Sequence, residues 1–158
     1  MSAKVSSAEL HAWETLQVVM EILKREVNRD LWSDAQLSEA EFTVLANLRL
    51  ATDGVRPRGC AEAIGWDSSR LAHQVGRLER RGLVSRRSDE RDGRGVVLVL
   101  TDEGREAYRR AIGPHLRSVQ KWFAAALTST HVEGMTASLD ALRGHIRHLT
   151  ATSPEDER

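Results

Sequence analysis

The chain has 158 residues, of which 41% are hydrophobic, and it carries 23 basic and 23 acidic side chains. At about 100 to 200 residues per domain, this length favours one compact domain with appended elements over two independent domains, and the hydrophobic content excludes disorder throughout. The sequence has no apolar run of about 18 residues, which a membrane-spanning helix requires. A single cysteine cannot form an internal disulfide. We therefore expect a cytoplasmic protein with no membrane partner.

Two predicted helices begin with the same signal, a serine followed three residues later by a glutamate, which is the spacing of a capping box. Ser6 and Glu9 open the first helix, and apolar residues recur after them at intervals of three and four over about 25 residues. Ser38 and Glu41 open the second helix, which we expect to end near Ala51. Both helices are amphipathic, so each has one face for a core or for a partner.

The middle of the chain predicts two further helices followed by a hairpin. A short helix over residues 57–64 starts with proline, which suits the first helical position. Asp67 can cap a fourth helix, and Gly82 ends it. Two β-rich runs at 83–87 and 95–100 then flank a polar turn that contains glycine, a pattern typical of a β-hairpin.

Two long helices are predicted after the hairpin. Thr101 caps the first, whose apolar pattern runs to Leu127 and stays in phase past Pro114, so we expect a kink there rather than a stop. Thr130 and Glu133 form a third capping box before the last helix. That helix carries a heptad-like stripe made of Val132, Met135, Leu139, Leu142, Ile146 and Leu149. We expect the stripe to form a dimer interface, because soluble monomers rarely expose a large apolar patch.

The order of a short helix, a tight turn, a longer helix and a charged hairpin indicates a winged helix-turn-helix, a mainly α fold with a small β-hairpin wing. If Leu71, Val75 and Leu78 face the core, the opposite face of the fourth helix carries side chains that bind bases or phosphates. That face holds Ser68, Ser69, Arg70, His73, Gln74, Arg77 and Arg81. This composition favours binding of double-stranded DNA.

The charge distribution supports the same interpretation. Residues 56–95 hold ten arginines and no lysine against six acidic residues, although the whole chain has no net charge. The wing tip contributes Arg91, Asp92 and Arg94 to this segment. Arginines on a narrow hairpin suit the negative potential of a minor groove, and Asp92 can hold Arg94 in an extended conformation. A solvated face of ion pairs is the alternative that composition alone leaves open.

The chain resembles the multiple antibiotic resistance regulator (MarR) family over residues 60–108, CAEAIGWDSSRLAHQVGRLERRGLVSRRSDERDGRGVVLVLTDEGREAY. The features that carry the resemblance are a helix ending in RLERRGLV, a wing of the form D-x-R-D-x-R and the strand-to-helix junction LTDEG. The run LSEAEFTVLANL at 37–48 resembles the family's second helix, and GPHLRSVQKWF at 113–123 is similar to a branch common in actinobacteria. Cys60 departs from the family, which usually has a bulkier aliphatic side chain there.

The resemblance implies a homodimer that reads a pseudo-palindromic operator, by default a repressor relieved by a small molecule. It implies dimerisation helices at 1–30 and 101–150, a winged helix-turn-helix lobe at 38–100, and a polar tail at 151–158. It also places Ser68, Ser69, Arg70, His73, Gln74 and Arg77 at the major groove, Arg94 at the minor groove, and Asp92 as a brace for Arg94. These roles follow from the family and not from the spacing of the residues.

An effector cavity in this family borders the first, second and fifth helices. Here Trp13, Phe42, Tyr108 and His115 fall on those helices, which favours a small aromatic effector, although filling of the core explains the same residues equally well.

Other functions have weaker support. The sequence has no glycine-rich phosphate loop, no G-x-S-x-G and no H-E-x-x-H, so we predict no enzyme and no cofactor. His145 and His148 stand three apart without a convincing carboxylate partner, and we predict no metal site. Cys60 is interpreted as a buried small hydrophobe rather than a redox sensor. A regulator that responds to metal or oxidants, or a helical dimerisation protein without DNA binding, remains the alternative.

Overall fold

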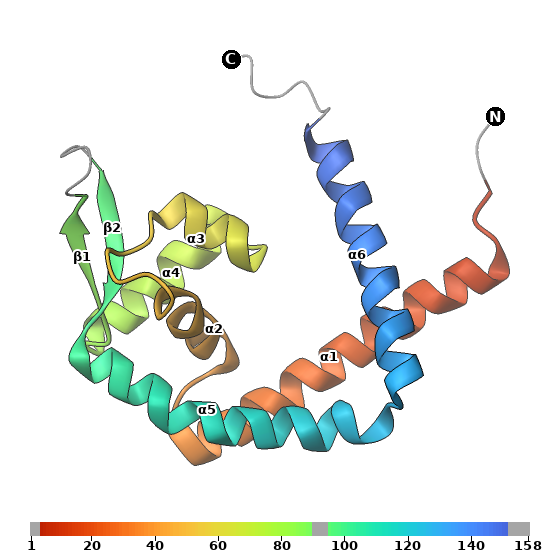
Figure 1. The fold of residues 1–158 in the computed structure, drawn as a ribbon, viewed down its shortest axis with the longest axis horizontal. Coiled ribbons are helices and arrows are strands. Elements are labelled where there is room, and N and C mark those ends of the chain that lie inside the picture. The colour runs from red at the N-terminus through yellow and green to blue at the C-terminus, as the bar shows by residue number, and fades with distance from the viewer. Residues whose placement is uncertain (1–3, 90–94, 152–158) are drawn as a thin grey trace. The chain divides into compact units, whose positions relative to one another are not determined.

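The computed structural model describes residues 4–89 and 95–151, and the chain divides into two compact units between Trp122 and Phe123 (Figure 1). The first unit contains α1 (Ser7–Ala35), α2 (Glu39–Leu48), α3 (Pro57–Ile64), α4 (Ser68–Arg80), β1 (Val84–Ser88), β2 (Val96–Leu100) and α5 (Asp102–Trp122). The second unit contains the 3-10 helix η1 (Ala124–Ala126) and α6 (Ser129–Ala151). This mainly helical chain with one two-stranded sheet confirms the fold class expected from the sequence.

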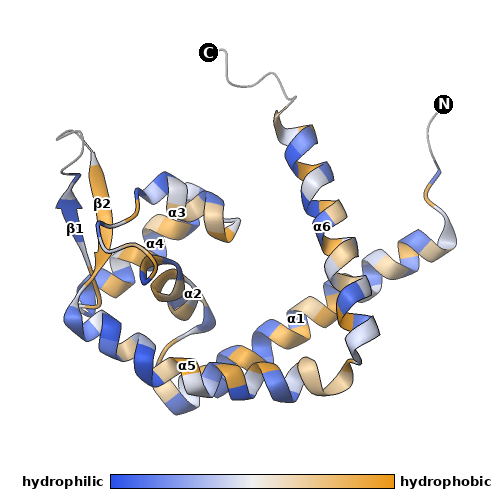
Figure 2. Cartoon of the chain, in the orientation of Figure 1, coloured by the Kyte–Doolittle hydropathy of each residue, from blue (hydrophilic) through white to orange (hydrophobic). Residues whose placement is uncertain are grey.

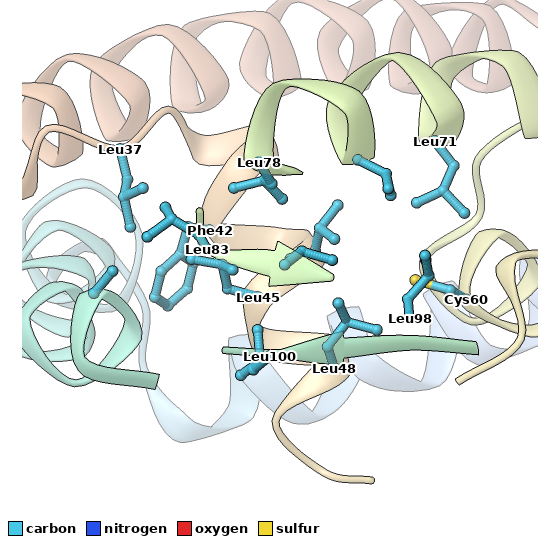
Figure 3. Close-up of a cluster of buried hydrophobic side chains, with 14 of the residues drawn as sticks. Leu37, Phe42, Leu45, Leu48, Cys60, Leu71, Leu78, Leu83, Leu98 and Leu100 are labelled. Atoms are coloured by element: carbon cyan, nitrogen blue, oxygen red, sulfur yellow. The ribbon is translucent and has the colours of Figure 1, made fainter. Parts of the chain in front are cut away.

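The hydrophobic core of the first unit lies among α2, α3, α4 and the β-hairpin (Figure 3). Leu45 of α2, Leu78 of α4 and Leu98 of β2 have no exposed surface, and Cys60 of α3 is buried with them. Burying one such leucine contributes roughly 1.5 to 3 kcal/mol. The apolar side of α4 is held in this core, as the sequence predicts, so its opposite side faces outward.

The hairpin and the start of α5 are joined by a close backbone contact. Strands β1 and β2 pair antiparallel from Val84 opposite Leu100 to Ser88 opposite Val96. The Thr101 hydroxyl accepts the backbone N–H of Gly104 at 2.9 Å, which confirms the predicted cap. A Cβ atom on Gly104 would lie 1.9 Å from the backbone oxygen of Leu83. The glycine of the LTDEG motif therefore lets α5 approach the end of the lobe.

Helix α5 packs along α1, and the residues that it buries are small ones rather than its large apolar ones. Its buried residues are Gly104, Ala107, Ala111 and Ser118. Leu116, which the apolar pattern includes, is 59% exposed. Asp30 of α1 binds the last turns of α5 by accepting hydrogen bonds from Ser118 Oγ at 3.0 Å and Trp122 Nε1 at 2.7 Å.

Two helix ends differ from the sequence-based expectation. Helix α2 ends at Leu48 and not near Ala51, because the chain tightens into turns in which the N–H of Ala51 bonds the Leu48 carbonyl at 3.3 Å. Helix α5 continues through Pro114, as predicted, but ends at Trp122 instead of running to Leu127. Phe123 leaves the helical conformation with φ −124° and ψ −63°, and η1 follows it.

The second unit consists mainly of α6, which has no buried residue in the single chain. Apolar and polar positions alternate along this helix (Figure 2). Its start also corrects a prediction: the cap is Thr128 and not Thr130. The Thr128 hydroxyl accepts the His131 N–H at 3.3 Å, and His131 Nδ1 accepts the Thr128 N–H at 3.4 Å. A histidine thus replaces the glutamate of the usual capping box.

Among the described residues, none of the helices combines the length and the hydropathy needed to span a membrane.

Candidate nucleic-acid interface

The outward face of α4 begins with exposed residues at a well-capped helix start. Asp67 caps the helix by accepting the Arg70 N–H at 2.8 Å. Ser68, Ser69, Arg70 and His73 are all exposed. Free backbone N–H groups and the helix dipole favour an anion at such a helix start. The structure therefore brings together four of the residues that the sequence assigned to DNA on one solvent-facing surface.

Arg70 is held in place by a residue that sequence analysis missed. Its guanidinium carbon lies 4.1 Å from the centre of the Trp66 ring, in a cation–π arrangement. Trp66 sits in the turn between α3 and α4 and packs its other atoms against the core. An aromatic residue four positions before an exposed arginine is the signal that could have revealed this support.

Gln74 and Arg77 lie at the edge of that surface, in a different environment. Gln74 is half-buried, and its Oε1 has no hydrogen-bond partner among the described residues. The Nε atom of Arg77 is 3.8 Å from Oε1 of Glu41 on α2. The structure therefore directs Arg77 partly toward the interior of the lobe, which the sequence did not predict.

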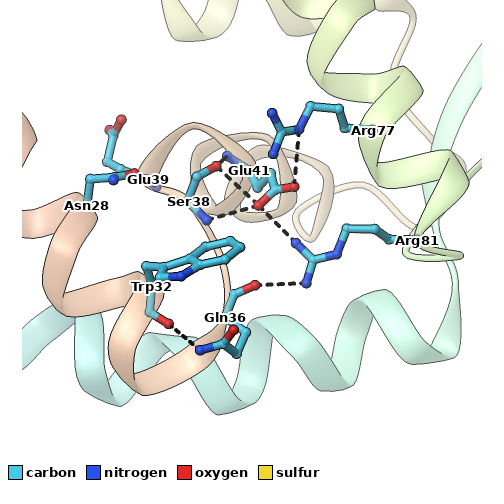
Figure 4. Close-up of polar contacts among 8 residues, drawn as sticks. All are labelled: Asn28, Trp32, Gln36, Ser38, Glu39, Glu41, Arg77 and Arg81. Atoms are coloured by element: carbon cyan, nitrogen blue, oxygen red, sulfur yellow. Dashed lines mark hydrogen bonds and ion pairs between the residues drawn. The ribbon is translucent and has the colours of Figure 1, made fainter.

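Glu41 of α2 binds Arg81, which follows α4 and also bonds the end of α1 (Figure 4). Its side chain has no exposed surface, and its Oε2 accepts hydrogen bonds from the Ser38 N–H at 2.9 Å and from Arg81 Nη1 at 2.9 Å. Arg81 also donates from Nη2 to the carbonyl of Gln36 at 2.8 Å. Gln36 ends α1 in a left-handed conformation with φ 54°. Arg81, which the sequence placed on the DNA-facing side, instead joins the ends of α1 and α4.

The pKa of Glu41 is below its ordinary value of 4.5. Burial by itself would raise this pKa, but the hydrogen bond from the Ser38 backbone and the hydrogen bond and charge of Arg81 together outweigh burial. The carboxylate is therefore ionised at neutral pH and stabilises the folded lobe there.

The body of the wing is described, but its tip is not. Arg86 of β1 forms an ion pair with Glu79 of α4 at 3.0 Å, so the first strand is bound to α4. Arg91, Asp92 and Arg94 lie outside the described residues. Their assignment to the minor groove stays a prediction.

Three of the four residues expected at an effector cavity form one stack. The Phe42 ring lies 4.3 Å from His115 and 5.5 Å from Tyr108, measured between ring centres. Arg49 extends the stack by donating from Nε to the Tyr108 hydroxyl at 2.7 Å. Phe42 is 5% exposed, so the rings fill the space between α2 and α5. Trp13 is 57% exposed, and no ring contact joins it to this stack within the chain.

His115 is the polar group of the stack. Burial lowers the pKa of its imidazole below the ordinary 6.5, and the charge of Glu39 offsets part of that effect. The ring is therefore neutral at pH 7. Its Nδ1 is buried without a hydrogen-bond partner among the described residues. A neutral imidazole with an unsatisfied nitrogen can bind a carboxyl or hydroxyl group of a ligand.

The stripe on α6 is exposed at every predicted position. Relative exposures run from 37% at Met135 to 57% at Ile146. The full set is Val132, Met135, Leu139, Leu142, Ile146 and Leu149. Apolar residues of the first half of α1, including Leu10 and Met20, are exposed as well.

No metal site and no reactive thiol emerges from the described part of the chain. Within residues 4–89 and 95–151, no group of three or more potential metal ligands is present. Cys60 is fully buried, and burial raises the pKa of its thiol. A thiol in this state is a poor nucleophile and fits the core role that the sequence predicts.

Known proteins are similar to this chain in both sequence and fold. No family model matches the sequence. The HTH-type transcriptional regulator PecS of Dickeya dadantii is 30% identical over 138 residues, which are 85% of this chain and 80% of PecS. Sco3205, a MarR family transcriptional regulator from Streptomyces coelicolor solved in complex with DNA, matches with a TM-score of 0.79 and 26% identity over 98% of this chain and 97% of its own. CouR from Rhodococcus jostii RHA1, solved with p-coumaroyl-CoA, matches with a TM-score of 0.72 and 28% identity over 81% of this chain and 88% of its own.

The Glu41 cluster gives a prediction for stability. Glu41→Gln keeps the shape of the side chain but removes the charge that binds Arg81, so it should lower the free energy of unfolding by about 1 to 3 kcal/mol at pH 7. Because the folded pKa is depressed, the difference between wild type and variant should persist above pH 4.5 and shrink as the pH falls through the lower folded pKa. Urea denaturation from pH 7 to pH 3 measures this. Glu62→Gln, at an exposed carboxylate, is the control and should change stability by less than about 0.5 kcal/mol; equal effects of the two variants would contradict the prediction.

Proposed function

Because the chain belongs to the MarR family of transcriptional regulators, we propose that it is a homodimer that binds a pseudo-palindromic operator and represses transcription until a small molecule releases it. Its relatives are regulators and not enzymes. The observation that carries the proposal is the capped, exposed face of α4, whose other side is fixed in the core. We place this function in the cytoplasm, where bacterial DNA lies.

The proposed DNA interface has three parts. Ser68 and Ser69 bind phosphate at the start of α4, and Arg70 and His73 read base edges in the major groove. Gln74 and Arg77 contact the DNA from the edge of this surface. On binding, the Arg77 guanidinium weakens its ion pair with Glu41 and pairs with a phosphate instead. The wing residues Arg91, Asp92 and Arg94 act at the minor groove. Sco3205, a relative solved in complex with DNA, supports DNA binding by this chain.

The proposed dimer uses the stripe on α6 together with the exposed half of α1. A helix of 23 residues with no buried side chain gains little stability by itself. Association of two copies would cover both apolar surfaces. We assign residues 1–30 and 101–150 to dimerisation and residues 38–100 to DNA binding, with two recognition helices about 34 Å apart, one turn of DNA.

The proposed effector site is centred on the stack of Phe42, Tyr108 and His115. The neutral His115 nitrogen offers a polar contact within apolar walls, which suits an aromatic carboxylic acid or its derivative. CouR, which binds p-coumaroyl-CoA, supports an aromatic ligand class. Trp13 is exposed in the single chain and lies apart from the stack. We include it in the effector site as a residue that dimerisation brings close to the stack. Opening the stack would move α2, which holds α4 through Glu41.

DNA recognition is tested with a duplex that the wild-type protein selects from a random pool. Arg70→Ala should cost about 1 to 3 kcal/mol of binding free energy and relax the preference at one base position. Arg109→Ala is the control, because it removes the same charge from an exposed ion pair with Glu106 on α5. Fluorescence anisotropy at fixed salt measures both affinities. Equal losses in the two variants would mean that charge alone is read, and would contradict base recognition by α4.

Dimerisation is tested by light scattering at micromolar concentration. Wild-type protein should have twice the chain mass of 17.7 kDa. Leu142→Glu puts a charge in the middle of the stripe and should shift the protein toward monomer, because burying an unpaired carboxylate costs several kcal/mol. Glu133→Gln, on the same helix but outside the stripe, should leave the dimer intact. A wild-type monomer would refute the proposal.

The effector site is tested with salicylate as the probe. Salicylate should raise the melting temperature and weaken DNA binding by about 5- to 150-fold, which corresponds to a coupling of about 1 to 3 kcal/mol. His115→Ala should reduce both effects together. Glu103→Gln, at an exposed position of the same helix outside the stack, is the control and should respond like wild type. A thermal shift that survives in His115→Ala would place the ligand elsewhere.

A further inference from the structure

An ion pair at the end of β1 that leads to the wing tip is left unexplained by the DNA contacts proposed above. Asp89 follows β1 and is 2% exposed. Arg56, the residue before α3, donates from Nε to Asp89 Oδ2 at 2.9 Å, and its Nη2 lies 2.9 Å from the same oxygen. The Asp89 N–H bonds the Gly95 carbonyl at 2.8 Å, which closes the described part of the hairpin. The pair therefore lies at the end of the hairpin that is farther from α5.

The segment that carries Arg56 is itself bound to the second strand. Val55 donates to and accepts from Leu98 of β2, at 3.0 and 2.8 Å. Gly54 has φ +88°, and a Cβ atom there would lie 2.7 Å from Cγ1 of Val99. This close approach requires glycine. Arg56 thus starts α3 and bonds the end of β1, while the residue before it bonds β2.

The sign of the charge argues that Asp89 positions the wing and does not bind DNA. A carboxylate on a DNA-facing hairpin repels phosphate, so it weakens binding by direct electrostatics. Burying it also costs free energy unless a cation is bound to it. Arg56 supplies that cation and links the hairpin to the first helix of the helix-turn-helix.

We propose that Arg56 and Asp89 are positioning residues that fix the wing to the start of α3, so that the wing and the recognition helix meet the DNA as one rigid unit. The expected effect of this ion pair on DNA binding rests on the proposed DNA interface, but the attachment of the wing to α3 is a property of the protein without DNA. Direct electrostatics and positioning predict opposite effects when the Asp89 charge is removed. That opposition makes the proposal testable with one conservative substitution.

The first arm measures affinity for the duplex that wild-type protein selects from a random pool. Asp89→Asn should weaken binding by at least about fivefold, the loss of roughly one contact. Asp53→Asn is the matched control. Asp53 is exposed, and together with Asp89 it lines a surface cavity of about 400 Å³. Removing its charge should leave binding unchanged or make it tighter. If Asp89→Asn bound as tightly as wild type, or more tightly, the proposal would be overturned.

The second arm measures amide hydrogen exchange in the protein without DNA. Asp89→Asn should speed exchange in residues 84–89 and 95–100, while α4 (Ser68–Arg80) keeps the wild-type rate. Unchanged exchange in the hairpin would overturn the proposal, and so would faster exchange throughout the lobe, because the pair would then support the whole fold. Faster exchange confined to the hairpin, in a protein whose wild type selects no duplex, would support the anchor and refute the proposed DNA interface.

Discussion

The buried charge of Glu41 is the interaction on which the arrangement of the DNA-binding lobe depends. The carboxylate caps its own helix through Ser38 and binds Arg81 at the end of α4, and Arg81 also bonds the last turn of α1 through Gln36. A carboxylate without partners in the interior costs several kcal/mol. The end of α1, the start of α2 and the end of α4 therefore cannot separate without leaving the Glu41 carboxylate buried and unpaired. The hydrophobic contacts hold the helices together, and this cluster joins the end of α4 to the start of α2 and the end of α1.

The local part of this fold could be predicted from sequence because its signals are short. Capping boxes, a proline at a helix start and the apolar side of α4 each involve residues within a few positions of one another. The contacts of Arg77 and Arg81 could not be predicted in this way. Helical periodicity gives the direction of a side chain, whereas its partner, Glu41, lies on another helix far away in the sequence. The Trp66 platform under Arg70 was missed for a different reason: the two residues are close in sequence, but the apolar pattern does not show which exposed side chain an aromatic ring contacts.

Where two signals compete, local spacing is also insufficient. Thr130 and Glu133 have the spacing of a capping box, yet Thr128 and His131 form the cap, in which a histidine nitrogen accepts the Thr128 N–H in the way a glutamate oxygen usually does. Along α5, hydropathy favours the large residues, but the residues that the helix buries in the core include small ones such as Ala107 and Ala111. Phe42, Tyr108 and His115 come together from two helices, while Trp13, equally aromatic, does not join them in the single chain.

The exposed apolar stripe of α6 affects how the amount of active regulator in a cell depends on its own concentration. If the helix is stabilised by a second copy, the free energy of unfolding contains a term that depends on the concentration of the protein itself. Newly made chains at low abundance are then less stable than the same chains once they are numerous, and proteases remove the unpartnered ones first. The amount of the regulator would then rise more steeply than its rate of synthesis, with no change in transcription.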